Sequence, residues 1–242
     1  ADNRVGIGTT APAQPLHVFK AGSQGGGLAP LIKIQNDTNN LTGDGAGIEF
    51  HGKYQGGEWG FGKIGGANSG SNFGGALEFH TNTGTGSVST GFTKKMTIDR
   101  NGYVTMPNQP SFSATGNFGW RDYNSYSEVP TWTVSQSKSH NVGGHFNTTS
   151  GRFTAPVAGR YQFNLIVYVN NTGEEYHNSK LYINGSKYAD NVLSHQSSSS
   201  NAYDNTTAGS YVVSLASGDY VSLYHINDIY GYHTTFSGYL LG

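Results

Sequence analysis

The stretch "RYQFNLIVYVNN", residues 160–171, carries the clearest fold signal in this chain. It contains neither glycine nor proline and is rich in β-branched and aromatic residues. Apolar and aromatic side chains occupy alternate positions, at Tyr161, Phe163, Leu165, Val167 and Val169. A period of two places them on one face of a β-strand. The stretch "SYVVSLASGDYVSLYHI", residues 210–226, repeats the period around "SGD", a tight-turn signal. Because helical periodicity is hard to find anywhere, the sequence predicts an all-β protein.

Composition excludes several classes of function. The chain has 242 residues, with 36 glycines, 16 tyrosines and 12% charged residues. The formal net charge is −1 with no basic block, so the electrostatic footprint of nucleic-acid binding is absent. No apolar run approaches the length of a membrane span. Without cysteine, disulfides, thiolate metal sites and cysteine nucleophiles are excluded. The chain starts mid-pattern without Met, so we expect it to be the C-terminal piece of a longer protein.

The stretch "VGIGTTAP", residues 5–12, fits the dinucleotide fingerprint G-x-G-x-x-G/A. That fingerprint requires a helix directly after it and an acidic residue about 20 positions further on. Pro12 and Pro15 fall in the first turns of the required helix, and no Asp or Glu occurs between Asp2 and Asp37. The sequence therefore predicts no nucleotide site here.

The chain has two halves with different patterns. In the first 107 residues, short predicted strands alternate with runs of Gly, Asn and Ser; they are "PLHVFKA", "LIKIQN", "AGIEFHG", "GALEFHT" and "KKMTIDR". The segments "DNRVGIGTTAPAQP" and "DRNGYVTMPNQP" resemble each other. Such short strands bury little apolar area in one chain, so we expect other chains to supply the missing faces.

The first half resembles the shaft repeats of bacteriophage tail fibres and neck fibres. The segments "RVGIGTTAPAQPLHV" and "TKKMTIDRNGYVTMP" carry the resemblance, because in that family "M-x-I-D-x-x-G-x-V" is commonly followed by "G-I-G-T-x-x-P-x-x-x-L-x-V". The resemblance covers residues 1–107 and implies a glycine-rich β shaft in which three chains wrap around a common axis. Gly6 and Gly8 are then expected in a tight, crowded turn.

The second half is similar to the globular head of complement C1q, a family that shares its jelly roll with tumour necrosis factor. The signature "G-x-F-t-x-P-x-x-G-x-Y-x-F" is met by Gly151, Phe153, Pro156, Gly159, Tyr161 and Phe163. The closing "F-S-G-x-L-L" is met at residues 236–241. The resemblance covers residues 110–242, so we expect a shaft domain at 1–107 and a head domain at 108–242. It implies a ten-stranded jelly roll in an intertwined homotrimer.

The alternation of short and long connections locates a candidate ligand surface. The turns in "INGSKY" and "ASGD" are short and fall at one end of the head, whereas three long connections fall at the other. The long connections carry aromatic and polar side chains suited to sugar rings and hydroxyls: Tyr176, His177, His195, Tyr203, Asp204, Tyr230, Tyr232 and His233. Four further aromatic residues are interpreted mainly as core or as shaft–head contacts: Trp120, Tyr123, Tyr126 and Trp132.

Metal binding and catalysis have weaker signals. No H-x-H or H-E-x-x-H spacing occurs, so the metal ligands are unknown; by analogy, an ion on a three-fold axis with oxygen ligands would be calcium. Glycosidases need two facing carboxylates, whereas Glu174 and Glu175 are adjacent and would point to opposite faces of an extended segment. We therefore expect neither an enzyme nor a required cofactor.

These observations predict the distal part of a phage tail fibre, located on the virion and acting at the exterior surface of the bacterial host. Its jelly-roll tip is expected to be an adhesin for a surface polysaccharide or lipopolysaccharide. The expected partners are two further copies of the chain and upstream fibre and virion proteins, without nucleic acid or membrane insertion. Two alternatives stay open: a depolymerase with carboxylates from adjacent subunits, and a structural neck or collar fibre whose head drives trimerisation.

Overall fold

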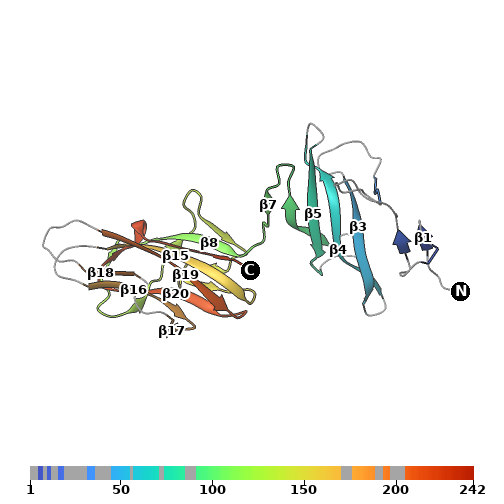
Figure 1. The fold of residues 1–242 in the computed structure, drawn as a ribbon. Coiled ribbons are helices and arrows are strands. Elements are labelled where there is room, and N and C mark those ends of the chain that lie inside the picture. The colour runs from blue at the N-terminus through green and yellow to red at the C-terminus, as the bar shows by residue number, and fades with distance from the viewer. Residues whose placement is uncertain are drawn as a thin grey trace. The chain divides into compact units, whose positions relative to one another are not determined.

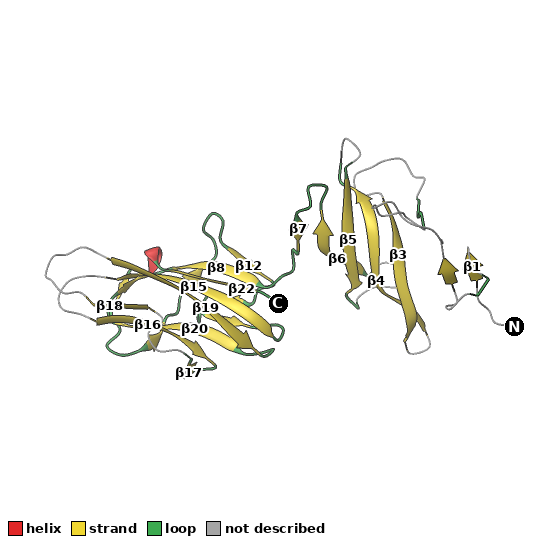
Figure 2. Ribbon diagram, viewed as in Figure 1, coloured by secondary structure: helices red, strands yellow, loops and turns green. Residues whose placement is uncertain are grey.

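The computed structural model describes residues 5–7, 10–11, 16–18, 32–35, 45–54, 57–70, 74–84, 91–169, 176–188, 193–196 and 205–242. The chain divides into two compact units, which we call the first unit (Ala1–Met106) and the head unit (Pro107–Gly242) (Figure 1). Apart from a single 3-10 turn, every regular element among these residues is a strand (Figure 2). The prediction of an all-β protein is confirmed.

The first unit contains a five-stranded antiparallel sheet. Its strands follow one another in the order β3 (Gly45–Tyr54), β4 (Gly57–Asn68), β5 (Gly75–Asn82), β6 (Phe92–Ile98) and β7 (Val104–Thr105). A separate parallel pair joins β1 (Val5–Ile7) to β2 (Leu16–Val18). The sequence missed β4, because its many glycines resemble a loop, and the strand expected in "LIKIQN" is wrong for the described residues 32–35.

The β3–β6 strands form an amphipathic sheet. Residues directly opposite one another share a face, so the register places Ile48, Ile64, Phe79 and Met96 in one row across four strands. The opposite face carries a row of Glu49, Lys63, His80 and Lys94. Ile48 and Phe50 on the apolar face are each 51% exposed.

Two sheets packed face to face form the head unit. The first, sheet I, has the order β11 (Trp132–Thr133), β8 (Ser111–Gly116), β22 (Thr235–Leu240), β15 (Gly159–Val169) and β19 (Asn205–Leu215), with β12 (His140–Val142) also paired to β8. The second, sheet II, has the order β13 (Phe146–Asn147), β14 (Arg152–Thr154), β20 (Tyr220–Ile226), β16 (Tyr176–Ile183) and β17 (Ser186–Lys187). Two short strands pair beside it, β10 (Ser127–Glu128) with β20 and β18 (Leu193–Gln196) with β16.

The head contains more strands than the ten expected, because several two-residue pieces pair at the edges of the two sheets. A further small pair joins β9 (Trp120–Arg121) to β21 (Ile229–Tyr230), and the 3-10 turn η1 (Gly231–His233) follows it.

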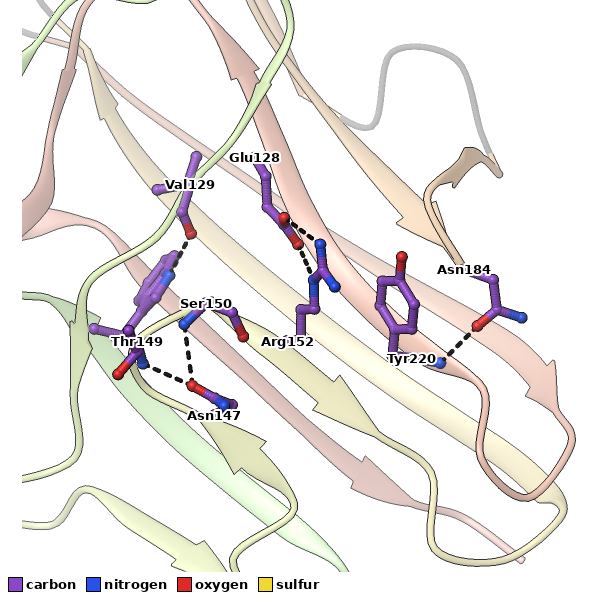
Figure 3. Close-up of polar contacts among 9 residues, drawn as sticks. Glu128, Val129, Asn147, Thr149, Ser150, Arg152, Asn184 and Tyr220 are labelled. Carbon is purple, nitrogen blue, oxygen red and sulfur yellow. Dashed lines mark hydrogen bonds and ion pairs between the residues drawn. The ribbon is translucent and has the colours of Figure 1, made fainter.

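The core lies between sheets I and II. The five alternating positions of β15 that the sequence predicts as one face are all buried. Phe163 contacts the rings of Phe112, Phe153 and Phe236 at centroid distances of 5.6–6.3 Å. Trp132 is also in this core, where its indole N–H donates to the Val129 carbonyl at 2.7 Å (Figure 3). The described strands of the head therefore form a sandwich filled mainly by aromatic side chains.

The two ends of the sandwich differ. The β16–β17 and β19–β20 turns meet at one end, where the Asn184 amide donates to an Asp219 carboxylate oxygen at 2.7 Å. Gly242 lies at the same end, since its carbonyl accepts the Arg160 N–H at 2.9 Å. Strands β15 and β18 end, and strands β16 and β19 begin, at the opposite end, which we call the loop end and which also holds the β20–β22 connection. Figure 1 shows these strand ends, and they agree with the predicted grouping of short turns and long connections.

Candidate functional site

The structure places the eight predicted ligand residues in different settings. Tyr203 and Asp204 lie outside the described residues, and so does the side chain of His195, which belongs to β18. Tyr176 and His177 begin β16 rather than lying on a loop, and His177 is only 2% exposed. Tyr230, Tyr232 and His233 lie together at the loop end, in β21 and η1.

Tyr230 is the centre of an aromatic cluster at the loop end. The cluster comprises Trp120, Tyr168, Tyr230, Tyr232 and His233. The Tyr230 ring lies 4.9 Å from those of Trp120 and His233, 5.7 Å from that of Tyr232 and 6.0 Å from that of Tyr168. Trp120 is 46% exposed and Tyr232 is 52% exposed. The cluster therefore presents large aromatic surface to solvent.

Two residues of this cluster were missed by sequence reasoning. Trp120 is paired with Tyr230 through the β9–β21 register and is too exposed to be core, whereas its other interpretation, a shaft–head contact, stays a prediction. Tyr168 lies on the outer face of β15, one residue from buried Val167 and Val169. The alternation within β15 already indicated that Tyr168 points outward, but not which residues lie beside it.

Close backbone packing holds the cluster in place. The N–H of Gly231 donates to the Gly119 carbonyl at 3.2 Å, and the N–H of Tyr232 donates to the Phe118 carbonyl at 3.0 Å. A Cβ on Gly231 would lie 2.5 Å from that Phe118 carbonyl oxygen, so only glycine allows this approach. Buried Thr234 bridges the turn to β15, since its hydroxyl donates to the Tyr230 carbonyl and accepts the Tyr168 N–H. The rings are thus fixed by the scaffold beneath them.

A buried histidine pair lies inside the sandwich near this end. His177 and His225 stack with their ring centroids 6.2 Å apart. His225 Nδ1 lies 2.9 Å from Ser179 Oγ, and Nε2 lies 3.3 Å from the Asp228 carbonyl, which matches a neutral imidazole. Burial lowers the pKa of His225 to about 3. Both rings therefore lie in the interior, and His225 is neutral there at pH 7.

The outer faces of sheets I and II differ in charge. On the four long strands of sheet I, all of whose residues are described, the outward positions carry uncharged side chains, including Tyr168 and Tyr239, with Arg160 the one charged residue. Sheet II carries Glu128, Arg152 and Lys180. Arg152 donates two hydrogen bonds to Glu128, at 2.7 and 2.8 Å (Figure 3). Burial is the largest single effect and raises the pKa of Glu128, but the Arg152 hydrogen bonds, the Ser222 hydroxyl and the Arg152 charge together outweigh burial and lower the pKa overall.

Tyrosines pack among the charges of sheet II. Arg152 lies 4.5 Å from the Tyr220 ring centroid, and Lys180 lies 3.7 Å from that of Tyr126. Tyr126, expected in the core or at a shaft–head contact, is thus a half-buried residue on this outer face, whereas Tyr123 packs against the core.

Within the described residues, no group of three or more histidine and acidic side chains is arranged to hold a metal ion. No helix in that same part of the chain is long and apolar enough to cross a membrane.

Known proteins resemble this chain in part. The Phage-like element PBSX protein XkdV of Bacillus subtilis (strain 168) is 34% identical over 105 residues, covering 39% of this chain. The chain spans about 15% of the length of that relative. The globular domain of the zebrafish complement 1qA protein is 19% identical with a TM-score of 0.36, covering 55% of this chain and 98% of that one. Eiger TNF from S. frugiperda is 12% identical with a TM-score of 0.43, covering 56% and 94%.

The family model of the C1q domain matches residues 125–241. This range contains both sheets of the sandwich except β8. Residues 125–241 are therefore similar to the C1q domain and have a jelly-roll-like all-β fold, in a chain similar to a phage-like element protein.

Proposed function

We propose that the chain is the distal part of a phage fibre, and that its head binds a neutral glycan on the surface of a bacterial host through the aromatic cluster. The cluster is the observation that carries the proposal, because exposed rings held by a rigid turn offer flat faces to the C–H surface of a sugar. The hydroxyl groups of Tyr230 and Tyr232 supply donors and acceptors for sugar hydroxyls. The similarity to a phage-like element protein supports a place on the virion, with upstream fibre proteins as neighbours.

The fibre is proposed to be a homotrimer. The outer face of sheet I supports this, because a surface whose long strands carry only one charged residue, Arg160, buries more easily against copies of itself than a highly charged one. The exposed apolar residues Ile48 and Ile64 in the first unit also favour burial against another copy of the chain. Three heads per fibre would add avidity to weak individual contacts. The division into a shaft at 1–107 and a head at 108–242 belongs to this proposal.

The decisive experiment is retention on purified surface polysaccharides from candidate hosts. We expect Trp120→Ala and Tyr230→Ala each to weaken binding about tenfold, since each removes a stacking ring. Tyr188→Ala is the matched control, because Tyr188 is 50% exposed but follows the short β16–β17 turn at the opposite end of the head. An equal loss of binding in all three variants, or no loss in any of them, would overturn the assignment of glycan binding to the aromatic cluster.

The uncharged face of sheet I also favours a second candidate, a structural fibre whose head only trimerises and caps the shaft. In that case the protein assembles but binds none of the polysaccharides, and the cluster variants leave phage adsorption unchanged. Polymer length measured after the same incubations tests the remaining alternative, a depolymerase. Intact polymer after binding supports an adhesin without catalysis, whereas shortened polymer would direct attention to carboxylates at subunit boundaries.

A further inference from the structure

A polar groove lies on the charged face of the β3–β5 strands, within the first unit. Its volume is about 390 Å³, which falls within the range of small-ligand sites. Glycine and alanine backbone forms its floor, including Gly47 and Gly65, and four polar side chains line it: Glu49, Lys63, Glu78 and His80. The function proposed above makes no use of this groove.

Strand register explains how the groove forms. Glu49 lies opposite Lys63, and Lys63 lies opposite His80, so these three side chains form a continuous polar row. In the next row Gly47 lies opposite Gly65, which lies opposite Glu78. The side chains of Glu49, Lys63 and His80 therefore stand beside Gly47 and Gly65, which have no side chains and form the floor of the groove. A Cβ on Gly47 would lie 2.7 Å from the Ile64 carbonyl oxygen, so the sheet itself requires glycine there.

The polar groups are fixed but retain bonding capacity. Glu78 accepts from Lys94 Nζ at 2.9 Å and pairs with His80 Nε2 at 3.1 Å. Burial by itself raises the pKa of Glu78, but these hydrogen bonds outweigh it and hold the carboxyl group ionised. An ionised carboxylate has about four acceptor positions, so Glu78 retains room for ligand hydroxyls. The Glu49 side chain is 42% exposed, so its carboxylate can also accept hydrogen bonds from ligand hydroxyls.

The charges of the groove select the class of ligand. Two carboxylates and Lys63 line the groove, and Lys94 lies beside Glu78. Because charges of both signs are present, the groove strongly attracts neither anions nor cations. Carboxylates are good acceptors for paired hydroxyls, and the Lys63 ammonium is a donor to hydroxyl or ring oxygen. The flat floor admits the C–H face of a pyranose ring. We propose that this groove is a saccharide-binding site for neutral hexose units, separate from the aromatic cluster of the head.

The inference shares only the ligand class with the proposed function, so the two sites are tested separately. The probe is a panel of neutral glucan, galactan and mannan heptasaccharides with hyaluronan as an acidic comparison, measured by calorimetry on the full chain. The groove variant is Lys63→Gln/Glu78→Gln. Its matched control is Lys53→Gln/Glu58→Gln, which neutralises an opposed pair where β3 ends and β4 begins, away from the groove. Both are also measured in the Trp120→Ala/Tyr230→Ala background, with circular dichroism to verify folding.

We expect the cluster background to retain binding of a neutral heptasaccharide, and the groove variant to reduce that binding at least tenfold while its control does not. Retained binding in the groove variant, no neutral binding in the cluster background, or binding of hyaluronan alone would overturn the inference. If the cluster variants change nothing while the groove variant abolishes binding, the groove stands and the function proposed for the head fails.

A single cysteine tests whether the groove is open in the assembled protein. The native chain has no cysteine, so Thr97→Cys, opposite Glu78 on the polar face, provides one reactive thiol. We expect rapid alkylation by iodoacetamide under native conditions, at a rate close to that of an unfolded control. Alkylation slowed at least a hundredfold would mean that another segment or copy covers this face, which would also overturn the inference.

Discussion

The first unit and the head unit use the same period-two alternation of side chains, but bury their apolar residues differently. In the head, sheets I and II face each other, and Phe163 and Phe236 are completely buried. In the described strands of the first unit, Ile48 and Phe50 remain half exposed, and every residue of the buried apolar core lies between Phe112 and Phe236. The alternation thus makes an amphipathic sheet in both units, and the presence of a second sheet decides whether a core results.

The largest expected effect comes from breaking the core of the head. Phe163→Ala removes a ring packed among Phe112, Phe153 and Phe236, so we expect it to lower the free energy of unfolding by about 3–5 kcal/mol. Phe50→Ala in the first unit, where the ring is half exposed, should cost less than about 1.5 kcal/mol under dissociating conditions. Urea unfolding followed by circular dichroism measures both. Equal costs would show that Phe50 is as fully packed as Phe163.

Acid should destabilise the head more than the first unit. The pKa of His225 in the folded state is about 3, below its ordinary value of 6.5, so the unfolded state binds a proton first as the pH falls. The stability contributed by neutral His225 is complete above pH 6.5 and declines as the pH drops towards 3. Between pH 6.5 and pH 4 the expected loss is about 3 kcal/mol.

Unfolding of the head at a series of pH values measures this dependence, and His225→Gln serves as the comparison. The variant should be less stable at pH 7 and should show a shallower dependence on pH. An unchanged slope would assign the acid sensitivity to other groups, such as the Glu128 carboxyl that Arg152 holds ionised.

A charge on the outer face of sheet I should weaken assembly. Ser210→Glu places a carboxylate on β19 in every copy, and like charges meeting in an interface oppose association. We expect at least a tenfold weaker association, measured by light scattering over a range of concentrations. Thr154→Glu places the same charge on the outer face of sheet II and should leave the mass unchanged. The reverse result would identify sheet II as the face used between copies.

The smallest effect concerns the turn end of the head. Asn184→Ala removes the bond to Asp219 at 2.7 Å. It also removes the acceptor for the Tyr220 N–H at 3.0 Å, which Figure 3 shows. Because these groups are exposed to water, we expect a loss of about 1 kcal/mol in the thermal unfolding of the head. Glycan binding at the loop end should be unaffected, and a change there would contradict the separation of the two ends.

The sequence alone was sufficient to predict features that depend on residues close together in the chain. The alternation from Tyr161 to Val169 predicted a buried strand face, and the "SGD" turn predicted the reversal between β19 and β20. Ordered motifs near Gly151 and Phe236 indicated the C1q-like fold. Strand β4 was missed, since its many glycines resemble a loop; the close approach of Gly62 to the His80 carbonyl of β5 and of Gly65 to the Ala46 carbonyl of β3 depends on strand pairing, which single-strand patterns do not reveal.

Tertiary structure alone determined which side chains meet. Trp120 and Tyr230 are far apart in sequence, and only the β9–β21 pairing brings their rings within 4.9 Å. The groove of the first unit likewise depends on the register that sets Glu49 opposite Lys63 and Gly47 opposite Gly65. The period of a strand fixes the face on which a residue lies, whereas its neighbours on that face are fixed by strand pairing, which is non-local. Local sequence therefore determined the strands and their buried faces, and strand pairing determined the two candidate sites.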